Sequence, residues 1–176
     1  MAQLERPGAL AAIGNTPVVH LSTLPGSESA DVWVKLEAAN PTGSYKDRMA
    51  LAMIEGAERS GALQPGQTVV EYTGGSTGSS LALVCGIKGY PLKIVSSNAF
   101  AEEKIATMRA LGADVELIHS DDGIHPELIS QMVARVEEIV EAEGAHPTDQ
   151  FDNLDLLDGY LGIGRELVEQ IDGEIH

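Results

Sequence analysis

Short β-branched segments alternate with helical segments through the middle of the chain, and this order constrains the fold more than any other feature. The strand-like segments cover residues 68–72, 92–96 and 115–118, and periodic apolar positions typical of helices lie between them. Strands that alternate with helices favour a parallel sheet, because a parallel connection needs a helical crossover. The sequence therefore predicts an α/β fold with an open, mostly parallel sheet flanked by helices.

Four helices are expected around this sheet and a fifth in the tail. They cover residues 44–59, 79–88, 102–111, 126–143 and 165–171. In the first of them Met49 and Met53 recur on one face, and Gly61 follows as the residue that ends the helix. A further strand is expected at residues 31–36, and residues 144–148 are expected to form a turn that leads the chain out of this lobe.

The charge and the single cysteine restrict the partners and the compartment. The net charge is −16, whereas nucleic acid and anionic membranes attract basic patches, so neither is an expected partner. No apolar run reaches the ~18 residues of a membrane span, and the N-terminus has no signal-peptide core. Cys85 cannot form an internal disulfide and lies in an apolar run, which predicts a core position and a reducing compartment. The chain is expected to be cytoplasmic.

The first segment with chemical potential reads Gly43-Ser-Tyr-Lys-Asp-Arg48. Ser44 or Thr42 is expected to be the N-cap of a helix, and Lys46 falls in its first turn. A cation at the positive end of a helix dipole should have a depressed pKa, which favours the neutral amine that a Schiff-base lysine needs. From the spacing alone, Lys46 could equally be an ordinary surface lysine.

The second segment reads Thr73-Gly-Gly-Ser-Thr-Gly-Ser-Ser80 and follows a predicted strand. Glycines let the backbone approach a ligand, and free amides at the start of a helix attract an anion. The segment is not a Walker A loop, and Thr73 stands where a Gly-x-Gly-x-x-Gly fingerprint needs glycine. It predicts a site for a carboxylate or phosphate, unless it is only a tight strand–helix turn. The histidines show no metal-ligand spacing, so no metal site is expected: His20, His119, His125, His146 and His176.

Four segments occur in the order found in the cysteine synthase (O-acetylserine sulfhydrylase) family, which the chain resembles from about residue 9 to its end. They are Ile13-Gly-Asn-Thr-Pro17, Asn40-Pro-Thr-Gly-Ser-Tyr-Lys-Asp-Arg48, Glu71-Tyr-Thr-Gly-Gly-Ser-Thr-Gly78 and Asp149-Gln-Phe-Asp-Asn153. The family belongs to the fold-type-II pyridoxal phosphate enzymes, whose fold is similar to that of the tryptophan synthase β subunit.

The resemblance implies a division into two domains. Residues 1–37 and 149–176 would belong to a large cofactor domain, and residues 38–148 would form a small substrate-loop α/β domain. The resemblance covers only the N-terminal half of the family fold. The C-terminal half, with the loop that binds the cofactor phosphate, is expected to be missing from this chain. Apolar side chains of the large-domain segments should then lack partners: Ile13, Val18, Val19, Leu161 and Val168.

The resemblance also implies the roles of individual residues. Lys46 would hold pyridoxal 5'-phosphate as an internal aldimine and move protons at the α-carbon of the substrate. Ser76 would face the ring hydroxyl of the cofactor. The substrate carboxylate would be bound by Thr73, Gly74, Ser76, Thr77 and Gln150. The partners would be an amino-acid substrate and a sulfide-like nucleophile, and a homodimer is the family expectation.

The function that the resemblance implies is β-replacement on an O-activated serine to give cysteine. Two alternatives stay open: a truncated, non-catalytic fragment with little cofactor binding, and a relative of cystathionine synthase or threonine dehydratase. One departure from the family concerns the substrate or leaving group. Gly74-Gly75-Ser76 stands where the commoner family loop has Ser-Gly-Asn.

Overall fold

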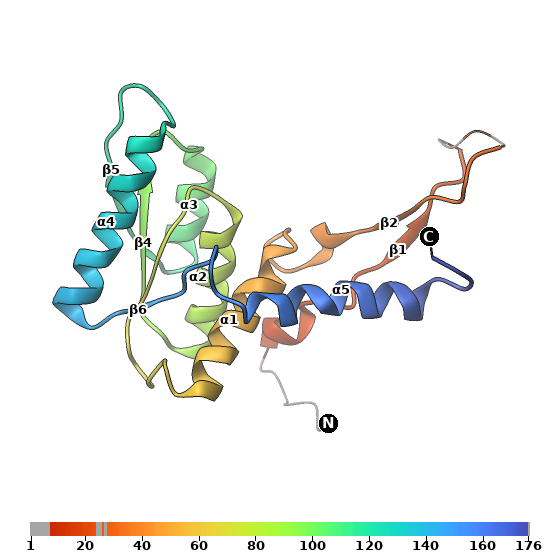
Figure 1. The fold of residues 1–176 in the computed structure, drawn as a ribbon, viewed down its shortest axis with the longest axis horizontal. Coiled ribbons are helices and arrows are strands. Elements are labelled where there is room, and N and C mark those ends of the chain that lie inside the picture. Colours follow the sequence, from red (N-terminus) through yellow and green to blue (C-terminus); the bar gives the residue numbers. More distant parts are fainter. Residues whose placement is uncertain (1–7, 24–25, 27, 176) are drawn as a thin grey trace.

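The computed structural model describes residues 8–23, 26 and 28–175. It consists of an α/β lobe and a long arm that extends from one side of it (Figure 1). Residues 1–7, which the sequence assigned to the large domain, and His176 lie outside the described residues.

The lobe is built on a four-stranded parallel sheet with the order β5-β4-β3-β6. The strands are β3 (Val69–Tyr72), β4 (Leu92–Ser97), β5 (Asp114–Ile118) and β6 (His146–Pro147). The first three were predicted, and the parallel α/β fold is confirmed. The turn predicted at residues 144–148 is wrong in part, because β6 pairs with β3. Pro147 is tolerated there because an edge strand can lack one N–H donor.

Helices cover both faces of this sheet, as predicted. One face packs against α1 (Lys46–Ser60), α2 (Ser76–Lys88) and α3 (Glu102–Ala110), and the other against α4 (Pro126–Glu143). Successive strand residues serve opposite faces, so Val69 and Val70 belong to different cores. Cys85 is buried in the first core, as predicted. Gly61 ends α1 in a left-handed conformation with φ of 75°.

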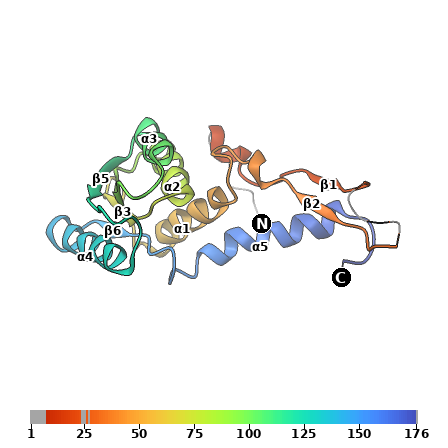
Figure 2. The ribbon, with the colours of Figure 1, turned by 90° about the horizontal axis from the view of Figure 1, so that it is seen from above.

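The arm combines residues from both ends of the chain. It contains the antiparallel strands β1 (Val18–His20) and β2 (Trp33–Lys35), and α5 (Leu156–Gln170) runs alongside them (Figure 2). The short 3-10 helices η1 (Gly8–Ala12) and η2 (Glu37–Ala39) lie near its junction with the lobe. The predicted tail helix at 165–171 captured only the second half of α5.

Much of the apolar surface of the arm is exposed. Val19, Leu161 and Val168 are exposed, as predicted, and α5 has no fully buried residue. The prediction was wrong for Ile13, which packs into the core of the lobe, and Val18 is half-buried. Within the described ranges, no helix is long and apolar enough to cross a membrane.

Candidate active site

Lys46 is the first residue of α1, and its amine lies in an aromatic setting. The Nζ atom donates a hydrogen bond to the Tyr160 hydroxyl at 3.1 Å and lies 3.7 Å from the sulfur of Met49. It also lies 5.0 Å from the centroid of the Tyr45 ring. Among the residues that the structure describes, no carboxylate lies within ion-pair distance of this amine. Lys46 is half-buried, and no described residue provides a fixed counter-ion for its amine.

The sequence prediction of a depressed pKa for Lys46 is wrong. Burial lowers the pKa of the amine, but the hydrogen bond to Tyr160 and the proximity of Tyr45 raise it, and the net direction is upward. A tyrosine hydroxyl can both accept and donate, so Tyr160 can bond either the ammonium or the neutral amine. The predicted capping role of Ser44 is supported, because its hydroxyl accepts a 3.2 Å bond from the Lys46 amide, as an N-cap side chain does. Tyr45, directly before α1, already has helical dihedral angles and makes no side-chain cap.

Asp47 joins the first turns of α1 and α2. Its buried carboxylate accepts a 2.6 Å hydrogen bond from the Ser80 hydroxyl of α2. It also accepts bonds from the hydroxyl and, at 2.8 Å, the amide of Thr42. A carboxylate at a helix N-terminus suits the dipole of that helix. The two segments that the sequence marked for chemistry are thus held side by side.

The predicted anion loop is shorter than the sequence suggested, because α2 already begins at Ser76. The hydroxyl of Thr73 accepts a 3.2 Å bond from the amide of Gly75, which closes the turn. A Cβ on Gly74 would overlap the ring of Phe100, so glycine is required there. A Cβ on Gly75 would meet nothing within 4 Å, so the backbone is open to a ligand at that point.

Gln150 lies against this loop although it is far away in sequence. Its Oε1 accepts a 2.7 Å hydrogen bond from the Thr77 hydroxyl, and its Nε2 donates to the carbonyl of Tyr72 at 3.1 Å. Five predicted substrate-binding residues therefore gather where β3 ends and α2 begins: Thr73, Gly74, Ser76, Thr77 and Gln150. No direct contact joins Lys46 to them within the described residues. Asp47 and Ser80 connect the two groups instead.

Residues 9–176 match the sequence profile of a family described as pyridoxal-phosphate dependent enzyme. The chain belongs to this family. A cysteine synthase of Staphylococcus aureus is 39% identical over 175 residues, which are 99% of this chain and 55% of that protein. Cysteine synthase B of Escherichia coli is 38% identical over 166 residues, 93% of this chain and 52% of that protein. The predicted resemblance to cysteine synthases is confirmed.

Solved structures give the same result for the fold. The crystal structure of an O-ureido-L-serine synthase superimposes with a TM-score of 0.87 at 31% identity, covering 97% of this chain and 52% of that one. The predicted fold-type-II architecture is thus confirmed. The chain spans about half the length of the curated relatives it matches.

Pyridoxal phosphate is the cofactor of this family, and the described residues fit its reactive end. Lys46 offers an amine that no carboxylate holds among the described residues, and the backbone at Gly75 is open. The Ser76 hydroxyl makes no hydrogen bond with a described residue, so it is available to a ring oxygen. The sequence prediction places the phosphate-binding loop in the half of the family fold that this chain does not span.

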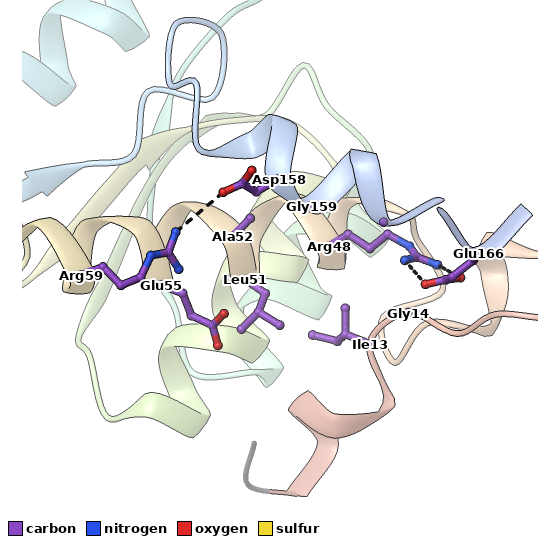
Figure 3. Close-up of a pocket in the computed structure, with 11 residues that line it drawn as sticks. Ile13, Gly14, Arg48, Leu51, Ala52, Glu55, Arg59, Asp158, Gly159 and Glu166 are labelled. Atoms are coloured by element: carbon purple, nitrogen blue, oxygen red, sulfur yellow. Dashed lines mark hydrogen bonds and ion pairs between the residues drawn. The ribbon is translucent and has the colours of Figure 1, made fainter. Parts of the chain in front are cut away.

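Arg48, the last residue of the segment Asn40–Arg48, connects the arm to the lobe through ion pairs. This role was not predicted from the sequence. The Arg48 guanidinium binds Glu37 at 2.8 Å and Glu166 of α5 at 2.6 Å, and Lys35 adds a 2.7 Å bridge to Glu166. Figure 3 shows the Arg48–Glu166 pair. The Arg48–Glu166 pair borders a hollow of about 540 Å³ between α1 and α5. The hollow contains none of the predicted site residues, and Figure 3 shows charged side chains at both ends of it.

The stability of this junction is expected to depend on acid pH through Glu166. Burial raises the pKa of Glu166, but bonds from Arg48, Lys35 and the Asn15 amide lower it to about 2. A depressed carboxyl pKa stabilises the fold above the ordinary value of 4.5, and this stabilisation is lost as the pH falls toward 2. Urea unfolding at a series of pH values should show that the free energy of unfolding falls more steeply with decreasing pH in the wild type than in Glu166→Gln. The same pH dependence in both proteins would contradict the stabilising role of the Glu166 carboxylate.

Proposed function

We propose that this chain carries the lysine and the carboxylate-binding loop of a cysteine-synthase-like enzyme. The reaction would replace the β-substituent of an O-activated serine with sulfide and give cysteine. The observation that carries the proposal is the Asp47–Ser80 hydrogen bond, because it holds the start of the Lys46 helix beside the start of α2. An amine and an anion-binding helix end are what an amino-acid substrate on this cofactor requires.

The carboxylate of the substrate would bind at the N-terminus of α2. Thr73 and Thr77 supply hydroxyl donors, and the Gln150 side chain supplies an amide donor beside them. The Thr77 hydroxyl now donates to Gln150, so it would turn to the substrate when a carboxylate arrives. Gly74 and Ser76 add backbone amides, and the dipole of α2 favours the negative charge.

Lys46 would hold the cofactor through its ε-amine and then act on the α-carbon of the substrate. A proton leaves that carbon, the leaving group departs from the β-carbon, sulfide adds there and a proton returns to the α-carbon. Bound pyridoxal phosphate supplies the electron sink for this sequence. Lys46 would carry the proton in both directions, and Tyr160 lies 3.1 Å from its amine, close enough to keep it oriented.

The two-domain division is part of this proposal. The arm supports it, because Lys35 of β2 binds Glu166 at 2.7 Å and Gln170 at 2.8 Å in α5, so residues from both ends of the chain form one unit. In this arrangement residues 38–148 provide the substrate loop, and residues 1–37 and 149–176 belong to the large cofactor domain.

The proposal predicts that pyridoxal phosphate, followed by borohydride reduction, labels Lys46 above every other lysine. Lys35, Lys88 and Lys93 are held by carboxylates at ion-pair distance, whereas the Lys46 amine contacts Tyr160, Tyr45 and the sulfur of Met49 and no carboxylate of the described residues. Peptide mass spectrometry at mildly alkaline pH should find the label at Lys46 about tenfold or more above Lys104, an exposed lysine, because a bound cofactor would hold its aldehyde against the Lys46 amine and so outweigh the raised pKa of that amine.

Two variants control this measurement. Lys46→Ala should remove the dominant label, while Lys104→Ala should leave it unchanged. Equal labelling of all the lysines, or labelling that survives Lys46→Ala, would show that the described residues do not form a cofactor pocket. Sulfide-dependent release of cysteine from O-acetyl-L-serine tests the chemistry itself, and ammonia with a keto acid would indicate a dehydratase.

A further inference from the structure

Glu71 is a buried carboxylate that the proposed reaction does not use. It lies in β3, directly before the loop, and only 1% of its surface is exposed. No cation lies within ion-pair distance of it among the described residues. An isolated buried charge is strongly unfavourable unless hydrogen bonds compensate it, so its bonds indicate what it does.

Within the part of the chain that the structure describes, every hydrogen bond to the Glu71 carboxylate comes from the strand end or from the loop that carries Gln150. Oε2 accepts from the Thr148 hydroxyl at 2.7 Å and from the backbone amide of Gln150 at 3.1 Å. Oε1 accepts from the Tyr72 amide at 2.9 Å. Burial raises the pKa of Glu71, and these three bonds offset part of that effect. The Glu71 carboxylate thus connects β3 to the loop at residues 148–150.

The loop itself is sharply turned and has few other attachments to the sheet. Asp149 adopts a left-handed conformation with φ of 50°, which costs energy in a residue other than glycine. The amide of Thr148 bonds to the carbonyl of Val70 at 3.1 Å, and beyond it the chain leaves the sheet. The Glu71–Gln150 bond is the next connection, and it fixes the backbone from which the Gln150 side chain reaches Thr77.

We propose that Glu71 is a positioning residue that holds Gln150 against Thr77 and so assembles the carboxylate-binding corner before substrate arrives. Glu71 touches neither substrate nor cofactor in this arrangement. It acts through Gln150, whose backbone it binds and whose side chain bridges Tyr72 and Thr77. The claim that Glu71 holds Gln150 against Thr77 depends on the contacts alone. Only the claim that Thr77 and Gln150 bind a substrate carboxylate rests on the proposed function.

The test is hydrogen exchange and NMR of the free, full chain without cofactor. In Glu71→Leu, the Gln150 backbone amide should exchange about tenfold faster or more, and the Gln150 side-chain amide resonances should move. Val69→Ala is the matched control, because Val69 is also fully buried in β3, two residues before Glu71, but its apolar side chain cannot hydrogen-bond to the loop. It should lower global stability yet leave the Gln150 signals in place. Equal exchange at Gln150 in the two variants would overturn the proposal.

Glu71→Asp provides the second variant if Glu71→Leu does not fold. It keeps the charge but withdraws the oxygens from the loop, so the same increase at Gln150 is expected, and its absence overturns the proposal. Titration of the wild type with O-acetyl-L-serine then separates the two proposals. If the exchange data support the Glu71–Gln150 contact but O-acetyl-L-serine does not shift the NMR signals of Thr77 and Gln150, the positioning role of Glu71 is retained and the proposed carboxylate site is refuted.

Discussion

Replacing Arg48 by methionine is expected to lower the free energy of unfolding by about 3–5 kcal/mol. The Arg48 side chain is only 5% exposed and binds Glu37 and Glu166 at the same time. Methionine fills similar space but leaves both carboxylates partly buried beside an apolar group. Lys35 still binds Glu166, whereas the Glu37 carboxylate keeps, among the described residues, the hydroxyl of Thr16 and the side-chain amide of Asn40. An uncompensated buried charge is the main cause of the loss.

Arg135→Met is the matched control for this prediction. Arg135 also holds two glutamates, Glu116 and Glu138, each with a bond of 2.8 Å, but its side chain is 37% exposed. Water screens such a pair, so the expected loss is much smaller than the loss at Arg48. Urea unfolding followed by circular dichroism measures both variants. Similar losses in the two would mean that Arg48 is no more than a surface ion pair and that the junction is held by other contacts.

Helices and strands with a clear apolar pattern in their own residues could be predicted from the sequence. Elements that form only because they pair with a distant segment could not. The strands β3, β4 and β5 contain β-branched residues, and the helices that connect them have apolar periodicity. This alternation was sufficient to predict the α/β fold of the lobe. β6 has two residues, one of them Pro147, and exists because Val69 and Val70 offer it a free edge. β1 and β2 have three residues each, but only β2 lies in a longer alternating segment, at residues 31–36, so β2 was predicted and β1 was missed.

The candidate site shows the same division between local and distant information. Lys46 and the Thr73–Ser80 segment could be found because motif and resemblance mark them along the sequence. Tyr160 carried no such mark, since it meets Lys46 only through the docking of α5. Glu71 begins one of the family segments, but its role inside a strand could not be predicted because its partners Thr148 and Gln150 are far away in sequence. The wrong pKa direction at Lys46 has the same origin, because the helix position was visible and the tyrosine hydroxyl was not.

The glycines of α5 explain why half of that helix was missed. Gly159, Gly162 and Gly164 weaken the helical pattern, since glycine costs about 1 kcal/mol relative to alanine inside a helix. A Cβ on Gly159 would overlap the carbonyl oxygen of Arg48 and lie 3.2 Å from the Cβ of Ala52. The two helices therefore cross backbone to backbone at this point, directly beside Tyr160. Gly164 has nothing within 4 Å of an added Cβ.

Gly159→Ala and Gly164→Ala are consequently expected to change stability in opposite directions. The Cβ of alanine at 159 would push α5 away from the carbonyl oxygen of Arg48, which is fixed within α1. Such overpacking should lower the free energy of unfolding by about 1–3 kcal/mol. Alanine at 164 adds helix propensity in open space and should raise it by up to about 1 kcal/mol. Urea unfolding of both variants measures the difference. Because Tyr160 follows Gly159, the Lys46 label should also weaken in Gly159→Ala alone. Stabilisation by both substitutions would refute the close crossing, and with it the route by which α5 brings Tyr160 to Lys46.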